Sequence, residues 1–408
     1  MGAPADRRIR ACPFEPCDEE CFMSDPAGES VTAHAPASRA AIAWFFALSG
    51  LSFSNWAVRI PDIRTLLELS QSQLGALLLC PVIGSLGLTL LSNYLNNRFG
   101  SRRMTRVAAC AIVVSLVLIG AAMSMLTLGL ALVVFGAGMG LLNIAMNDQA
   151  ATLERRYRRS IMSSFHGLFS LGGMAGSLVG GALATLGLTP RCHLLLVAGL
   201  LMVGILIAHR HLLAPPPRAE RPVGALFVRP KGRVWLLGII AAAVVFIEGS
   251  MADWSALFLT ELGASRGHAA LGLAVFTGTM AVGRLLGDRW LDRVGAVRAL
   301  EIGSALALLG LGLAIVAASP IAALAGFALA GIGMSTLFPC LLSLAGRNRS
   351  MSPSGAIASV AMLGYLSMLG GPPMLGFLAE AITLHYAFVA LVVAAALAIA
   401  LARPAARA

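Results

Sequence analysis

The sequence predicts an all-α membrane protein in which twelve spanning helices form two pseudo-symmetric bundles of six. Three observations lead to this prediction: an apolar composition, twelve long apolar runs, and a set of glycines that recurs at one spacing. Hydrophobic residues make up 58% of the 408 positions and charged residues only 12%. Soluble domains average roughly 45–50% and 25%, so this composition indicates a chain that lies in lipid.

Twelve apolar runs are long enough to cross a membrane. The hydrocarbon core of a bilayer is about 30 Å thick and needs roughly 20 apolar residues per helix. The polar links between the runs are short, which argues against a soluble helical protein. We place the twelve spans near 39–58, 73–95, 104–123, 126–149, 162–186, 193–212, 234–257, 269–289, 298–317, 320–344, 353–378 and 384–402.

Basic side chains predict the orientation of the chain. The net charge is +11, but the arginines fall in short clusters between apolar runs and not in a patch beside stacking aromatics, which argues against nucleic-acid binding. Arginine and lysine prefer cytoplasmic loops, and a basic cluster follows each even-numbered span from the second to the tenth. We therefore expect a multi-pass protein of a bacterial-type inner membrane, with both termini in the cytoplasm.

Two polar segments divide the chain. Residues 213–233 are rich in proline, which cannot extend either neighbouring helix, and they separate units at 39–212 and 234–403. Residues 1–38 have the composition of a disordered cytoplasmic tail, with Met23 as an alternative start. The three cysteines of this tail lack a fourth ligand for a metal site, and the cysteine spacing predicts no disulfide framework. We expect no metal and no cofactor.

A set of glycines recurs at an offset of 195 positions. One shared offset across several spans predicts two similarly oriented halves, as in transporters whose substrate site lies near the middle of the membrane, where the halves meet. Alternating access would then follow from rocking one half against the other. The pairs are Gly100 and Gly295, Gly136 and Gly331, Gly138 and Gly333, Gly176 and Gly371, and Gly181 and Gly376.

Two short basic hairpins, NNRFGSRR and LDRVGAVR, follow spans two and eight. The glycine in each permits a tight reversal of the chain. With twelve spans and a basic central linker, these hairpins resemble the Major Facilitator Superfamily, whose hairpin reads approximately G-x-L-x-D-R-x-G-R-R. The matching residues are Arg98, Gly100 and Arg102 in the first copy, with Asn97 where the acid belongs, and Asp288, Asp292, Arg293 and Gly295 in the second.

The resemblance implies a role for these hairpins and for the whole chain. In the family, the hairpin acid holds the cytoplasmic ends of the two halves together, so Asn97 implies a weaker latch than Asp292. Stretches such as FSNWAVRIPDIR and FIEGSMADWSALFL are similar to a bacterial branch of inner-membrane permeases related to fucose-type sugar/proton symporters. The resemblance therefore implies a transporter and not an enzyme.

Ionisable groups inside a membrane are costly, so each is a functional candidate. Glu248 is placed roughly 22 Å into span seven at about 1.5 Å per residue. Its carboxyl group could take up and release a proton as the site opens to either side, or could be a structural acid. Asp253 is a second candidate for proton coupling or an interfacial acid, and Trp254 is a substrate contact or an interfacial anchor.

In span one, Asn55, Arg59 and Asp62 recur at spacings of four and three and share a helical face. Asn55 and Arg59 are candidates for substrate binding or gating. If Pro61 ends the helix, however, Arg59 and Asp62 form only an exposed outer pair.

Span four carries Asn143 and Asn147 on one face, where two amides can bind sugar hydroxyls or join helices. The offset-195 partner of Asn143 is Phe338, which predicts a site with one polar wall and one apolar or aromatic wall. His166 is either a titrating group or a structural hydrogen-bonder, and Arg284 is expected to snorkel or to pair locally.

Together these residues predict a proton-coupled secondary transporter of a small polar solute, with sugars favoured. Two alternatives stay open: efflux of amphipathic compounds through the methionine-rich spans, and a transporter-like receptor without turnover. No phosphate loop, zinc motif or nucleophile elbow occurs in a credible context. The expected partners are a small-molecule substrate, protons and membrane lipid, with no nucleic acid, and the chain is expected to act as a monomer.

Overall fold

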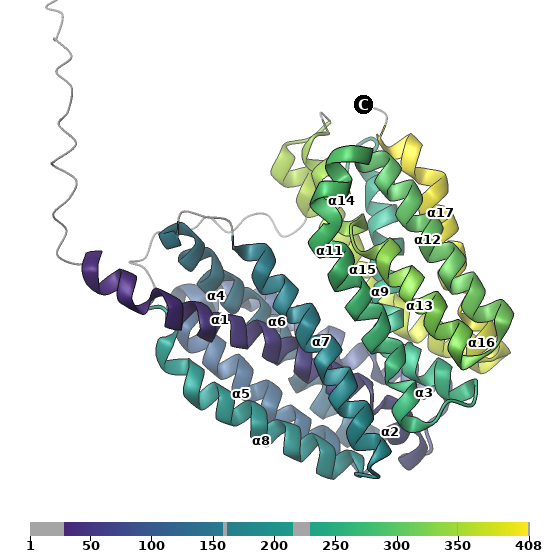
Figure 1. Ribbon diagram of the computed structural model, residues 1–408, viewed down its shortest axis with the longest axis horizontal. Coiled ribbons are helices and arrows are strands. Elements are labelled where there is room, and N and C mark those ends of the chain that lie inside the picture. Colours follow the sequence, from purple (N-terminus) through teal and green to yellow (C-terminus); the bar gives the residue numbers. More distant parts are fainter. Residues whose placement is uncertain (1–27, 158–160, 215–228, 349, 407–408) are drawn as a thin grey trace, which may run out of the picture.

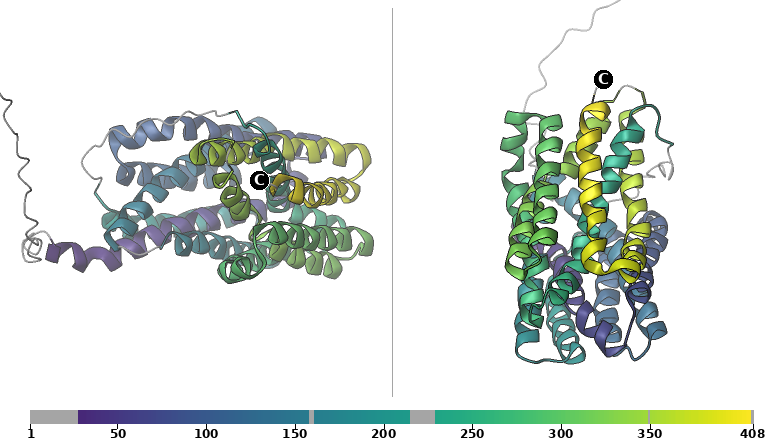
Figure 2. Two further views of the ribbon diagram at one scale, coloured as in Figure 1. Left: turned by 90° about the horizontal axis from the view of Figure 1, so that it is seen from above. Right: turned by 90° about the vertical axis from the view of Figure 1, so that its right-hand side faces the viewer.

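A computed structural model of the chain describes residues 28–157, 161–214, 229–348 and 350–406. Over these ranges the protein is helical, without strands, and twelve helical segments are long and apolar enough to cross a membrane. The predicted fold class and the count of spans are therefore confirmed. Figures 1 and 2 show an N-terminal bundle, coloured purple to teal, beside a C-terminal bundle, coloured green to yellow.

The N-terminal bundle holds the first six spans, two of which are broken. The first span is α1 followed by α2, and the second is α3 followed by α4. The bounds are α1 Gly28–Ala57, α2 Ile60–Leu66, α3 Gln71–Leu77, α4 Leu79–Phe99, α5 Ser101–Gly120, α6 Met125–Tyr157, α7 Met162–Thr185 and α8 Pro190–Ala208, with a short 3₁₀ turn, η2, at His209–His211.

The C-terminal bundle repeats this plan with its own breaks. The bounds are α9 Val234–Glu261, α10 Arg266–Ala269, α11 Leu271–Val294, α12 Ala296–Ala317, α13 Pro320–Met334, α14 Leu337–Gly346, α15 Pro353–Ile382, α16 Leu384–Ala387 and α17 Val389–Ala406. Helices α8, α13 and α15 each begin with a proline, preceded by a Thr or Ser whose side chain accepts a backbone N–H of the first turn. These are the residues that helix starts prefer.

The first helix starts earlier than the apolar pattern predicts. Residues 28–38, expected in a disordered tail, belong to α1, because extending a helix that is already nucleated costs less than forming its first turn. Residues 1–27, with the three tail cysteines and Met23, lie outside the described residues, as does most of the linker. The start of the linker is anchored, since Leu213 N–H donates to Gln149 Oε1 at 2.8 Å.

The two bundles repeat each other in their contacts as well as in their glycines. A Cβ at Gly136 would collide with the carbonyl oxygen of Pro81, and a Cβ at Gly331 would collide with that of Phe276. Pro81 and Phe276 are themselves 195 positions apart. The offset read from the sequence therefore describes one helix-packing arrangement that occurs twice.

The bundles approach each other most closely at one end, which we call the closed end. The opposite end, where α8 ends and α9 begins, is the linker end. At the closed end α3 packs against α15, and α7 packs against α10 and α11. A Cβ at Gly75 of α3 would lie 2.9 Å from Gly376 Cα of α15. Glycine at both positions thus permits backbone contact between the bundles. Figure 1 shows the bundles separating toward the linker end.

Candidate functional site

A polar group links the bundles near the middle of their helices. Arg284 on α11 donates through Nη2 to Glu248 Oε1 on α9 at 3.2 Å, and its Nη1 lies 3.5 Å from Ser170 Oγ on α7 of the other bundle. The side chains of Glu248 and Arg284 are 37% and 32% exposed. We call these three residues the central group. The expectation that Arg284 snorkels or pairs locally is wrong, because its partner lies on another helix, which sequence spacing does not reveal.

Aromatic and hydroxyl-bearing side chains lie around the central group. His166, one turn before Ser170, stands edge-on to Phe46 of α1 at 5.3 Å between ring centroids. His166 and Tyr365 of α15 lie within electrostatic reach of Arg284 and Glu248 respectively. The surroundings therefore combine hydrogen-bonding groups with aromatic faces, and they come from both bundles.

The partly exposed residues of α9 form one stripe. Residues Ala242, Val245, Gly249 and Ala252 recur at spacings of three or four, the period of one helical face. Helix α9 packs its other faces mainly on α11, α14, α15 and α17, so the stripe lies toward α1 and the other bundle. Glu248 lies along one edge of this stripe and Asp253 along the other. Asp253 has no hydrogen bond or ion pair within the described part of the chain.

A second polar network, nearer the closed end, is centred on a buried arginine. Arg59, 1% exposed, donates to Asp62 Oδ2 at 2.6 Å, to Leu188 O at 3.0 Å and to His193 Nδ1 at 2.6 Å. The reading of Arg59 and Asp62 as an exposed outer pair is therefore wrong: the helix does break before Pro61, but α8 covers the break. His193 was missed from the sequence, although a lone histidine in an apolar span is a signal of the same kind as Glu248.

The hydrogen bonds of this network define the state of His193. Arg59 Nε can only donate, so His193 Nδ1 accepts and its Nε2–H donates to Asn55 Oδ1 at 2.7 Å. The amide nitrogen of Asn55 in turn donates to Leu51 O at 2.8 Å. Asn55 is 1% exposed and both of its polar side-chain atoms are hydrogen-bonded, so a substrate cannot reach it in this conformation.

Three side chains of the C-terminal bundle make polar contacts with the N-terminal bundle across the closed end. Arg266 of α10 pairs with Asp62 at 3.3 Å, and Glu261 of α9 accepts from Gln71 Nε2 at 2.6 Å with Arg64 at 3.8 Å. Glu380 of α15 accepts from the backbone N–H groups of Gln71 and Ser72 at 2.8 and 3.2 Å. We call these the closing contacts. They join the two bundles at the closed end. These ion pairs and hydrogen bonds must break if the bundles separate there.

Comparison with known proteins identifies the family. The sequence profile of the Major Facilitator Superfamily matches residues 42–365 and 254–407. An uncharacterised MFS-type transporter of Yersinia pestis is 38% identical over 344 residues, covering 84% of this chain and 89% of the relative. The membrane protein MosC of Rhizobium meliloti is 34% identical, covering 84% of each chain. The chain belongs to the Major Facilitator Superfamily.

Solved structures share the superfamily fold. A bacterial homologue of the lysosomal transporter Spinster, in an inward-facing and unoccupied conformation, superposes with a TM-score of 0.71 at 18% identity, over 92% of this chain and 97% of that one. The nucleoside transporter NupG gives 0.70 at 12% identity, over 90% and 98%. A variant of the Escherichia coli fucose:proton symporter FucP gives 0.60 at 15%, over 90% and 98%.

The two superfamily hairpins have the same backbone turn. Gly100 has φ 82° and ψ 143°, and Gly295 has φ 78° and ψ 155°, a region that favours glycine. Arg102 Nη2 donates to Arg210 O at 2.9 Å, so the first hairpin binds the end of the sixth span. Asn97, Arg98 and Arg293 are exposed. The side chains of Asp288 and Asp292 lie outside the described residues, and the latch that the resemblance implies stays a prediction.

The remaining candidates are placed less centrally. Asn147 Nδ2 donates to the backbone and side-chain oxygens of Asn143 at 2.7 and 3.0 Å, on the exposed side of α6. Phe338 is half-buried, with its ring edge near Gly364 of α15. Trp254 is fully buried inside its bundle, so the reading as an interfacial anchor is wrong, and a substrate contact there would require another conformation.

Proposed function

We propose that this protein is a secondary transporter that moves a small, hydroxyl-rich solute by alternating access and couples the movement to protons. The observation that carries the proposal is the central group: a charge pair held between α9 and α11 that also reaches Ser170 of the opposite bundle. Charged groups within a membrane are costly and mark solute and ion pathways. This pair lies at the junction that must rearrange when the bundles rock.

One arginine can link proton binding to solute binding. The guanidinium of Arg284 offers five N–H donors and no acceptor, and Glu248 occupies part of them. A proton on Glu248 removes the negative charge that holds Arg284, and the freed donors can then bind solute hydroxyls. Loss of the proton restores the pair and releases the solute. Asp253, without a partner in the described part of the chain, is the second proton-binding group of this proposal.

The chemistry around the central group favours a solute rich in hydroxyl groups. Ser170, His166 and Tyr365 offer hydrogen bonds, and the amides of Asn143 and Asn147 add donors and acceptors on α6. Tyr365, which is exposed, also supplies an aromatic face. The fold is shared with a nucleoside transporter and a fucose:proton symporter, whose solutes carry several hydroxyl groups, and this supports the class without naming the solute.

The orientation follows from the basic clusters on the linker side. With both termini in the cytoplasm of a bacterial-type inner membrane, the closed end faces outward. The conformation described here is then closed to the outside by the closing contacts. An inward-facing neighbour of the same fold supports this assignment.

Proton flux in proteoliposomes tests the proposal. Purified protein is reconstituted and given L-fucose, D-glucose or uridine, and the external pH is followed for the intact chain and for Glu248→Gln. We expect a pH change that requires one of these solutes and disappears in the variant. Glu301→Gln is the matched control, since Glu301 pairs with Arg403 on the outside of the C-terminal bundle at 2.5 Å, and it should keep the flux.

Two results would contradict the proposal. Coupled flux that persists in Glu248→Gln would make Glu248 a structural acid. If none of the three solutes moves protons while amphipathic dyes are expelled, the efflux alternative replaces uptake.

A further inference from the structure

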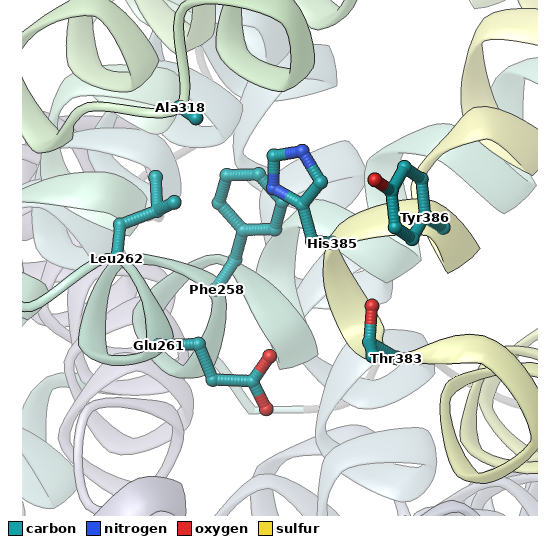
Figure 3. A pocket seen from close by; sticks show the side chains of 7 residues that line it. All are labelled: Phe258, Glu261, Leu262, Ala318, Thr383, His385 and Tyr386. Carbon is teal, nitrogen blue, oxygen red and sulfur yellow. The ribbon is translucent and has the colours of Figure 1, made fainter.

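A pocket of about 320 Å³ lies at the closed end of the C-terminal bundle, away from the central group. It is formed by the end of α9, the link between α12 and α13, and the link between α15 and α16 (Figure 3). Its volume is at the lower end of the range of small-molecule sites, roughly 300–1,000 Å³. The lining residues are Phe258, Glu261, Leu262, Ala318, Thr383, His385 and Tyr386.

One side of the pocket is an ordered aromatic wall. The rings of Phe258 and His385 stack at 5.6 Å with an interplanar angle of 12°, and Tyr386 stands edge-on to His385 at 5.3 Å and 88°. Phe258 is itself held from behind by Phe388 at 4.2 Å. Phe258 is buried between His385 and Phe388, so it holds the His385 ring in place, and His385 and Tyr386 supply the aromatic surface that a ligand can contact.

The opposite side is polar. Figure 3 shows the carboxylate of Glu261 and the hydroxyl of Thr383 on the same side of the pocket, facing the space below the rings. One carboxylate oxygen, Oε1, is engaged by Gln71 and Arg64 in the closing contacts. The other, Oε2, has no contact recorded within the described part of the chain. A ligand hydroxyl can therefore donate to Oε2 without displacing the closing contacts.

The backbone at this pocket is held in an unusual conformation. Thr383 has φ +100° and Ala318 has φ +43°, and they are two of the three non-glycine residues with positive φ among the described residues. A β-branched residue at such a φ is a true outlier. Strain of this kind persists where the surrounding structure requires it and clusters at ligand sites. Here the turn at Thr383 brings its hydroxyl and His385 into the same pocket.

The charges around Glu261 select the class of ligand. The carboxylate of Glu261 repels an anionic ligand. Arg64, 3.8 Å away, already balances the charge of this carboxylate, so a cationic ligand would gain little from it. A neutral ligand with several hydroxyl groups and one apolar face suits both walls.

We propose that this pocket is a second solute site, for a small neutral polyhydroxylated molecule, and that its occupancy stabilises the closed end through Glu261. Gln71 and Arg64 hold Glu261 in place only while the bundles are closed, so the solute binds the closed conformation best. By linkage, the solute favours closure by the same factor. The site is separate from the central group and goes beyond the proposed function.

Labelling of a cysteine in the pocket tests this site. Leu262→Cys is introduced into a chain whose seven native cysteines are replaced by serine, and the rate of maleimide labelling is measured in detergent. The probes are D-glucose, L-fucose and myo-inositol at millimolar concentrations. We expect at least one probe to slow labelling several-fold, and Thr383→Val, which removes the hydroxyl but keeps the branched side chain, to abolish the effect.

A variant of one closing contact tests whether binding in the pocket is coupled to closure of the bundles. Gln71→Ala should raise the concentration of probe needed for half-protection by about fivefold or more, the usual scale of coupling between sites. The control is Thr65→Ala. Thr65 is exposed and outside the closing contacts, so this variant should leave the half-protection concentration unchanged. An unchanged midpoint in Gln71→Ala would overturn the link.

Two further measurements distinguish binding in this pocket from binding at the central group and from misfolding of a variant. Protection must persist in Arg284→Ala; if it is lost there, the effect comes from the central group and the proposal fails. In the unaltered chain, the same probe should slow hydrogen exchange of residues 380–388. If none of the three probes changes either labelling or exchange, the pocket is not a solute site of this class.

Discussion

The closed-end parts of α1 and α9 occupy corresponding places in the two bundles, yet their polar groups differ: those on α1 are hydrogen-bonded and several on α9 are not, within the described part of the chain. On α1, the hydroxyls of Ser52 and Ser54 donate to carbonyls one turn back, and Asn55 is bound by His193. On α9, Ser250 Oγ, Trp254 Nε1 and Ser255 Oγ are buried with no partner among the described residues, and the structure gives Asp253 none there either.

This difference shows which of the two helix segments has its polar groups paired in the closed conformation. Buried polar groups are nearly always hydrogen-bonded, and each exception calls for an explanation. The network around Arg59 needs no further partner, so it works as a rigid support. The groups on α9 have no partner from the described part of the chain and are open to water, a ligand or a new helix contact, which agrees with placing the coupling residues on α9.

The largest loss of stability is expected where the network around Arg59 is broken. Arg59→Leu leaves His193 Nδ1 and the carboxylate of Asp62 without their donor in a buried site, and we expect a loss of roughly 3–5 kcal/mol of stability. A thermal-unfolding assay of the purified protein checks this. Arg64→Leu is the control: its side chain is 27% exposed, its ion pair is long at 3.8 Å and it makes one hydrogen bond, to Leu69 O, so a smaller loss of about 1–2 kcal/mol is expected. Equal losses in both variants would mean that the network is not a special support.

A smaller and symmetric effect is expected from the helix contacts that the bundles share. Gly136→Ala and Gly331→Ala each place a methyl group against the backbone of the facing helix, and overpacking of this kind costs typically about 1–3 kcal/mol. Gly312→Ala is the control, because no atom lies within 4 Å of its added Cβ, and it should be neutral or stabilising. A large difference between the first two variants would show that the contacts are not equivalent.

The smallest change in stability is expected at the unpartnered acid. Asp253→Asn removes no recorded interaction, so stability should stay within about 0.5 kcal/mol of the intact chain. Asp62→Asn, which weakens the contacts to Arg59 and Arg266, should cost about 1.5–3 kcal/mol. Both are measured by thermal unfolding, with proton flux as a second readout for Asp253→Asn. A strong loss of stability in Asp253→Asn would reveal a structural role and remove it from the proposed proton route.

The sequence predicted the properties that depend on single helices. The twelve spans follow from apolar length, the two hairpins from glycine and charge, and the repeat from the offset that also relates Pro81 and Phe276 in space. Glu248 was selected as a candidate because a charged residue inside an apolar span is unusual. Each of these signals depends on residues within one helix or turn, so the sequence alone is enough to detect it.

The pairings between helices could not be predicted in the same way. Arg284 and Glu248 are 36 positions apart, and Arg59 and His193 are 134 positions apart, so neither spacing suggests a contact. The pocket at the closed end depends on the positive φ of Thr383. Because a β-branched residue rarely has a positive φ, the sequence gives no signal for this turn. These features arise from how the bundles pack and require the structure.

The most direct test of alternating access is a distance between the bundles at the closed end. Spin labels at Thr65 and Ala381, both exposed and outside the closing contacts, would report the separation of the two bundles in liposomes. The account predicts a short distance that lengthens in a second population when pH or solute is changed, and a larger share of that population in Gln71→Ala. A single short distance under all conditions would contradict rocking of the bundles and favour a receptor without turnover.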